Sequence, residues 1–421
     1  MEPPIQALES GDAVCLFPEG MSRYHPTIAP LKTGVARIVS DVLTRNRENP
    51  DFEVSLLTCS ITYMHRQHFR SDVLVTFHPP IKVTPRRNPE LLAPVNFNDI
   101  RSLTAKMHHE ISSGTLSAPS WRLIRNAKLA ARIYAPLGTE MSLGDYVRVV
   151  ISFQEAFKLA EAPHIESSSD GEANLSDSGE ALDARIISLG SSLKHYQDEL
   201  VRWGVKDDRI RRPLRRRVII YRMSVRLLWS IFLFSISFPG LFLWLPVFIT
   251  TFIAVREFKR TGPIWDTWDE IAQYKLVYGL ISGICVWAGA VLLTFPIAPI
   301  SAVAVPIIMW TSLRWLEDAV SAFRAFAALA RLLWMGRARM LKLQVERSDL
   351  HGGVMDLAIN TIGLPADPEK FFAETGRKEK GRVRGKWASS AKYFSLRRRR
   401  KRDWNETLRL YDKVDYPDDP Y

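Results

Sequence analysis

Hydrophobic residues change their spacing along the chain, and these changes predict where strands, helices and membrane segments lie. Three runs, 13–17, 53–64 and 72–83, are rich in β-branched and aromatic residues, which is typical of strands. Between the first two runs, residues 29–46 carry apolar side chains at helical spacing, so the order strand–helix–strand predicts a parallel pairing. Residues 100–155 are predicted to be helical. We therefore expect an α/β domain over residues 1–155.

The composition changes after this domain. Residues 161–183 are rich in Ser, Asp, Glu and Gly and poor in apolar residues, which predicts a disordered acidic linker over 156–183. Helical periodicity returns in residues 184–222, which we interpret as a helical, basic juxtamembrane segment. Its predicted apolar face consists of Ile186, Leu189, Leu193, Tyr196, Leu200 and Trp203.

Two long blocks contain no charged residue. The first lies between Arg226 and Arg256, and the second lies between Lys275 and Arg314. A helix needs about 20 apolar residues to cross a bilayer, so both blocks are long enough, and we expect membrane segments at 223–256 and 274–313. Two single spans and two hairpins that dip in from one face both fit, because the second block is longer than one crossing needs. Prolines that predict kinks interrupt both blocks: Pro239, Pro246, Pro296, Pro299 and Pro306.

Charge indicates the orientation and the kind of partner. The chain has 57 Lys and Arg against 45 Asp and Glu, a net charge of +12, which suits an anionic partner. Both outer flanks of the apolar blocks are basic, whereas the connection 256–275 has equal numbers of basic and acidic residues. The positive-inside rule therefore predicts cytosolic N- and C-termini. We expect residues 314–421 to form a basic helical region and a largely disordered tail. Its basic residues alternate with aromatic ones, which favours a phospholipid membrane over nucleic acid as its partner. The three cysteines are far apart and predict neither a disulfide framework nor a metal site.

The stretch Phe17-Pro18-Glu19-Gly20 is the strongest candidate for chemistry. Pro18 fixes φ, and Gly20 permits a backbone conformation that a Cβ would hinder. Three side chains that follow can donate to phosphate oxygens, namely Ser22, Arg23 and Lys32. Glu19 can accept hydrogen bonds from hydroxyl groups. The pattern fits a polyol phosphate, although a surface turn with ordinary charges fits the residues equally well.

The same stretch resembles a motif of the glycerol-phosphate acyltransferase family. The chain reads Phe-Pro-Glu-Gly-Met-Ser over 17–22 and Pro-Leu-Lys-Thr-Gly-Val-Ala over 30–36, where the family has Phe-Pro-Glu-Gly-x-Ser and Pro-Leu-Lys-x-Gly-x-Ala. A second stretch, 62–83, resembles a strand pair of the fungal glycerol-3-phosphate and dihydroxyacetone-phosphate acyltransferases, through Tyr63, Phe69, Arg70, Ser71, Val75, Phe77, Pro80 and Ile81. The resemblance implies that Glu19 and Ser22 hold the acceptor and that Gly20 forms the turn. The role of Arg23 is inferred from its charge, and Lys32 either contacts the phosphate or caps a helix.

The family's catalytic motif, Asn-His-x-x-x-x-Asp, lies upstream of this turn and is absent from the chain. We therefore predict no catalytic residue and no metal ligand here, and we expect the chain as given to be inactive. His351 and Asp356 have the right spacing, but they follow the apolar blocks, and nine histidines make such a match expected by chance. The catalytic half is then missing either from the protein or from a chain shortened at its N-terminus.

The resemblance implies a partial glycerolphosphate acyltransferase domain followed by helical membrane segments. The expected activity is acyl-CoA-dependent O-acylation of sn-glycerol 3-phosphate or dihydroxyacetone phosphate in phospholipid synthesis at the endoplasmic reticulum membrane. Acyl-CoA would be a co-substrate, and no cofactor is implied. Two alternatives stay open: a non-catalytic membrane protein that kept only acceptor binding, and a lysophosphatidate acyltransferase.

Overall fold

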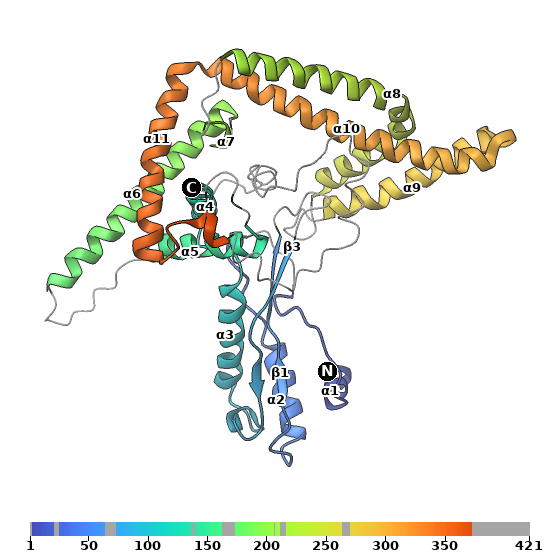
Figure 1. The fold of residues 1–421 in the computed structure, drawn as a ribbon. Coiled ribbons are helices and arrows are strands. Elements are labelled where there is room, and N and C mark those ends of the chain that lie inside the picture. The colour runs from blue at the N-terminus through green and yellow to red at the C-terminus, as the bar shows by residue number, and fades with distance from the viewer. Residues whose placement is uncertain are drawn as a thin grey trace.

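A computed structural model describes residues 2–20, 25–63, 73–135, 139, 141–161, 173–205, 207–210, 216–262 and 270–372. The structure is mostly helical (Figure 1). The predicted tail beyond residue 372 and the middle of the predicted linker, 162–172, lie outside the described residues. The rest of that linker is helical, because one helix continues through 156–161 and the next includes 173–183.

The N-terminal part combines helices with two short antiparallel ladders. Its helices are α1 (Glu2–Glu9), α2 (Gly34–Arg45), η1 (Pro89–Leu91) and α3 (Phe97–Ser113). Its strands are β1 (Val54–Leu56), β2 (Cys59–Tyr63), β3 (Val73–Phe77) and β4 (Ile81–Val83). Strand β1 pairs with β4 and strand β2 pairs with β3, so the four strands form two consecutive stretches of one ribbon. The ladder is interrupted at Pro79 and Pro80, which have no N–H to donate.

Two predictions for this part are wrong. Residues 13–17 are not a strand, and each strand pairing in the described part of the chain is antiparallel rather than parallel. The first run lies outside both ladders, and its Leu16 and Phe17 side chains are exposed. A β-rich composition needs a neighbouring strand to become a strand, and the order of elements does not fix which neighbours pair.

A first hydrophobic core joins α1, α2 and α3 to one face of the β1–β4 ladder. Its members include Ile5 of α1, Val42 of α2, Val83 of β4 and Met107 of α3, each buried. The buried Ser40 hydroxyl donates to the carbonyl of Leu91 at 2.6 Å and attaches α2 to η1. This core holds the N-terminus of α2 beside the segment that carries Phe17–Gly20.

A second, larger core is mostly helical, and Leu74 of β3 packs against it. It joins α4 (Trp121–Tyr134), α5 (Leu143–Glu161), α6 (Ala173–Trp203), α7 (Asp207–Ile210), α11 (Arg337–Asp356) and the π-helical turn η3 (Leu357–Ile362). The predicted apolar face of α6 is confirmed, because Ile186, Leu193, Tyr196 and Leu200 are buried in this core. Helices α6 and α11, which are far apart in sequence, lie side by side (Figure 1).

Three helices are long and apolar enough to cross a membrane. They are α8 (Arg216–Thr261), α9 (Glu270–Leu293) and α10 (Ala298–Met335), which is preceded by the short turn η2 (Phe295–Ile297). The second apolar block of the sequence is therefore broken into two helices at Thr294–Ile297. These three helices indicate that the protein associates with a membrane.

Candidate functional site

Residues 17–20 form a compact turn whose shape is fixed by backbone hydrogen bonds. The N–H of Gly20 donates to the carbonyl of Phe17 at 3.0 Å, and the N–H of Lys32 donates to the carbonyl of Pro18 at 2.8 Å. Gly20 has a φ of +72°, a left-handed conformation that L-residues adopt only with strain. The glycine predicted from the sequence is therefore required by the backbone of this turn.

The Lys32 side chain lies directly on Gly20. A Cβ added to Gly20 would be 2.5 Å from Lys32 Nζ and 2.7 Å from Lys32 Cε, so any larger residue at position 20 must displace the lysine. Lys32 is exposed and stands one residue before Thr33, the N-cap of α2, which makes no side-chain capping bond. An ammonium group cannot accept from the free N–H groups of a helix start, so Lys32 does not cap α2. Instead, the ammonium and the positive end of α2 both favour an anion at this place.

The structure brings together three of the five predicted site residues. Glu19 and Gly20 belong to the turn, and Lys32 covers Gly20. Glu19 is half-buried, and none of the described side chains pairs with its carboxylate. Ser22 and Arg23 lie outside the described residues, so their assignment stays a prediction.

The N-terminal part also carries an exposed apolar surface. The outward face of the β2–β3 ladder exposes Ile61, Tyr63, Val73, Val75 and Phe77, which we call the apolar ribbon face. Burial, with a smaller contribution from the Cys15 thiol, raises the pKa of the Cys59 thiol at the start of β2. Phe17, at the start of the turn, is 75% exposed. Open apolar surface is therefore present both at the start of the turn and on the β2–β3 ladder.

The sequence did not reveal a hydroxyl–imidazole pair at the end of the β2–β3 ladder. Ser60 Oγ lies 2.6 Å from His78 Nε2 and donates to the carbonyl of Ile111 at 2.8 Å. Ser60 is only 1% exposed, and a Cβ added to Gly114 would be 2.5 Å from His78 Cε1. Because the pair is packed against the end of α3, we interpret it as a structural link between β2, β3 and α3.

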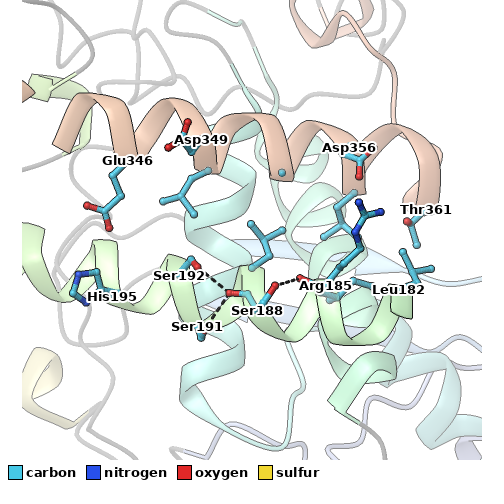
Figure 2. A pocket seen from close by; sticks show the side chains of 15 residues that line it. Leu182, Arg185, Ser188, Ser191, Ser192, His195, Glu346, Asp349, Asp356 and Thr361 are labelled. Carbon is cyan, nitrogen blue, oxygen red and sulfur yellow. Dashed lines mark hydrogen bonds between the residues drawn. The ribbon is translucent and has the colours of Figure 1, made fainter. Parts of the chain in front are cut away.

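A groove of about 640 Å³ lies between α6 and α11, away from the turn. Figure 2 shows Glu346, Asp349 and Asp356 on α11 facing serine hydroxyls and the Arg185 side chain on α6. Three α6 serines along it, Ser188, Ser191 and Ser192, donate to backbone carbonyls of their own helix. The carboxylates on α11 would repel a phosphate, so the groove does not suit the predicted acceptor.

The geometry of α11 does not favour His351 and Asp356 as a catalytic pair. Both residues belong to α11, and five positions along an α-helix turn the side-chain direction by about 140°. The Asp356 carboxylate instead accepts from Asn360 Nδ2 at 2.6 Å. Within the described ranges, no three His, Cys, Asp or Glu residues lie close enough together to hold a metal ion.

Comparison with known proteins points to one family. The sequence profile described as "Glycerol-3-phosphate acyltransferase 2 C-terminal domain" matches residues 180–261, which include most of α6 and all of α8. This chain is related to the glycerol-phosphate acyltransferases. An uncharacterised acyltransferase of Schizosaccharomyces pombe is 27% identical over 395 residues, which cover 86% of this chain and 53% of that relative. No solved structure matches the chain.

Two relatives from Saccharomyces cerevisiae support the same relationship. Glycerol-3-phosphate O-acyltransferase 2 is 26% identical over 284 residues, which cover 65% of this chain and 35% of that protein. Glycerol-3-phosphate O-acyltransferase 1 is 23% identical over 289 residues, which cover 66% and 34% respectively. The chain thus spans between one third and about half of the length of the acyltransferases that it matches. The predicted resemblance is confirmed.

Proposed function

We propose that this chain contributes the acceptor-binding part of an acyl-CoA-dependent O-acyltransferase that acts on sn-glycerol 3-phosphate or dihydroxyacetone phosphate. The reaction would belong to phospholipid synthesis at the endoplasmic reticulum membrane, with both termini of the chain in the cytosol. The observation that carries the proposal is the position of the Lys32 ammonium on Gly20, at the turn that resembles the family's motif. The relationship to glycerol-3-phosphate acyltransferases supports the class of acceptor.

The turn suits a small polyol phosphate for electrostatic reasons. The phosphate would lie at Lys32 and at the N-terminus of α2, where a cation and a helix end both stabilise negative charge. The Glu19 carboxylate would accept from the acceptor's hydroxyl groups and so orient the oxygen that attacks the thioester. We propose that Ser22 and Arg23 complete this site, as the resemblance and the charge of Arg23 imply.

The apolar surroundings fit the second substrate. The apolar ribbon face and Phe17 are exposed, so they could contact the acyl chain of an acyl-CoA. No metal or cofactor is needed for this transfer, because the acceptor oxygen attacks the thioester carbon and the thiol of coenzyme A leaves. The general base that the resemblance implies has no counterpart among the residues that we can assign, so the proposal concerns acceptor binding first.

The experiment measures binding of the acceptor to the full chain in detergent. Equilibrium dialysis with labelled sn-glycerol 3-phosphate compares the wild type with Lys32→Met, which keeps the length of the side chain and removes the charge. A hydrogen bond to a charged group contributes about 1.5–3 kcal/mol, so the variant should bind roughly 10- to 100-fold more weakly. Lys32→Arg should retain most of the affinity. Lys106→Met, which changes an exposed lysine of α3, is the matched control.

The choice of acceptor can be tested at Glu19. Glycerol 3-phosphate offers two hydroxyl groups and dihydroxyacetone phosphate only one, so Glu19→Gln should weaken the former more. Equal affinity of wild type and Lys32→Met would contradict the proposed phosphate position. Preferential binding of lysophosphatidate would favour the lysophosphatidate acyltransferase alternative instead.

A further inference from the structure

The two ends of the apolar region are bound to each other. Helix α7 precedes α8 and helix α11 follows α10, and Arg347 Nε of α11 lies 2.7 Å from the Asp207 carboxylate of α7. The two side chains are only 13% and 1% exposed. In addition, the Gln344 side-chain amide donates to the carbonyl of Ile210 at 2.8 Å. The chain therefore enters and leaves the membrane at the same face, which excludes one crossing by each of the three apolar helices.

Helix α8 bends back on itself. Its first half packs along α10, where Ser230 Oγ donates to the Ala319 carbonyl at 2.9 Å and Trp244 Nε1 donates to the Met309 carbonyl at 2.7 Å. Its second half lies instead against the start of α9, where the rings of Phe258 and Tyr274 are 4.8 Å apart. Figure 1 shows the sharp bend between the two halves. Two prolines within the helix, Pro239 and Pro246, account for a kink there, since each removes a helical hydrogen bond.

Helices α9 and α10 form a second hairpin that extends beyond the bend of α8. Trp287 Nε1 donates to the Ala302 carbonyl at 3.0 Å, and the hydroxyls of Thr294 and Ser301 lie 2.7 Å apart across the turn. At about 1.5 Å per residue, the stretch from Lys275 to Leu293 is about 27 Å long. A bilayer core is about 30 Å thick, so the tip of this hairpin can stay inside it.

Charged residues bound the arms of both hairpins on the side away from the tips. The arms begin or end near Arg226, Arg256, Lys259, Arg260, Lys275 and Arg314. By contrast, the bend of α8 and the tip of the second hairpin contain no charged residue, and Leu293 and Phe295 at the tip are 88% and 77% exposed. Such side chains would be unfavourable in water, whereas lipid would cover them.

We propose that α8 and α9–α10 are two helical hairpins that enter the bilayer from one face, the face on which α6 and α11 lie. The end of α8 and the start of α9 then return to that face. Two single spans would place the same two helix ends on the opposite face. The proposal depends on the packing of these helices and is independent of the acyltransferase activity.

Single cysteines in the full chain can distinguish the two arrangements. The three native cysteines are replaced by serine, and sealed vesicles of known orientation are treated with a membrane-impermeant maleimide. Thr261→Cys, at the exposed end of α8, should label from the outside to the same extent as the control Ser191→Cys on α6. Leu293→Cys, at the apolar tip, should stay unlabelled until detergent dissolves the bilayer.

Protection of Thr261→Cys in sealed vesicles, with Ser191→Cys labelled, would overturn the proposal. Labelling of Leu293→Cys from the far side, after a pore-forming toxin admits the reagent, would also overturn it. A second experiment needs no cysteine replacement. A glycosylation acceptor, Asn-x-Thr, is inserted after Gly262, and addition of a glycan to it is measured. We expect no glycan there, because the enzyme that adds glycans works on the far side, and addition of a glycan would contradict the hairpin.

Discussion

The replacement of Gly20 by alanine tests the candidate site most directly. Gly20 has a φ of +72°, and the added Cβ would lie 2.5 Å from Lys32 Nζ. Because the nearest atoms belong to the free end of a flexible side chain, the backbone can stay in place while the lysine moves away. In the variant, the Lys32 ammonium should therefore move away from the turn while the fold is retained.

The expected magnitudes separate two effects. A left-handed conformation costs a residue with a Cβ about 1–2 kcal/mol, which lowers stability. Displacement of Lys32 removes one hydrogen bond to a charged group, so the dissociation constant for glycerol 3-phosphate should rise roughly tenfold.

Gly11→Ala is the matched control. Gly11 also has a positive φ, +82°, but an added Cβ would meet nothing within 4 Å. Both variants should lower the Tm by a similar amount in thermal unfolding, and only Gly20→Ala should weaken acceptor binding in equilibrium dialysis. If both variants bind the acceptor as the wild type does, Lys32 does not hold the phosphate. If both bind more weakly by the same factor, the effect comes from stability and the reasoning is wrong.

Three further predictions follow from other parts of the structure. Arg347→Met should destabilise the protein by about 3 kcal/mol in denaturant unfolding, because it removes the guanidinium that lies 2.7 Å from the buried Asp207 carboxylate. Arg202→Met, which breaks an exposed pair, should cost less than about 1 kcal/mol. Burial raises the pKa of Tyr134 from 10.0 to about 12. The buried, protonated phenol therefore contributes fully to the free energy of unfolding below pH 10, and this contribution falls towards pH 12 because the unfolded chain loses the proton first. Tyr134→Phe should remove that alkaline loss, and an identical pH dependence of unfolding in both proteins would contradict the assignment. We expect the 421-residue chain to transfer no acyl group to glycerol 3-phosphate in microsomes; activity that His351→Ala abolishes would show that this residue was wrongly dismissed.

Local patterns in the sequence identified features that depend on near neighbours. The turn at Phe17–Gly20 was predicted from Pro18 and Gly20, and the structure gives Gly20 the positive φ that the residue type suggests. The buried face of α6 followed from helical periodicity, because side chains three and four positions apart must share one side of a helix. The apolar blocks followed from length and lack of charge alone.

Partners that are distant in sequence could be found only in the tertiary structure. The strand predicted at 13–17 did not form, and the ladders are antiparallel, because pairing depends on which segments become neighbours. The contact of Lys32 with Gly20 joins two residues twelve positions apart, and it supports the phosphate role that we propose for the lysine. The ion pair between Asp207 and Arg347 joins helices that are 140 positions apart, and the two halves of α8 pack on different helices, α10 and α9. Composition thus indicated that the chain associates with a membrane, while the packing of α7 against α11, which only the tertiary structure gives, supports the proposal that it enters and leaves at one face.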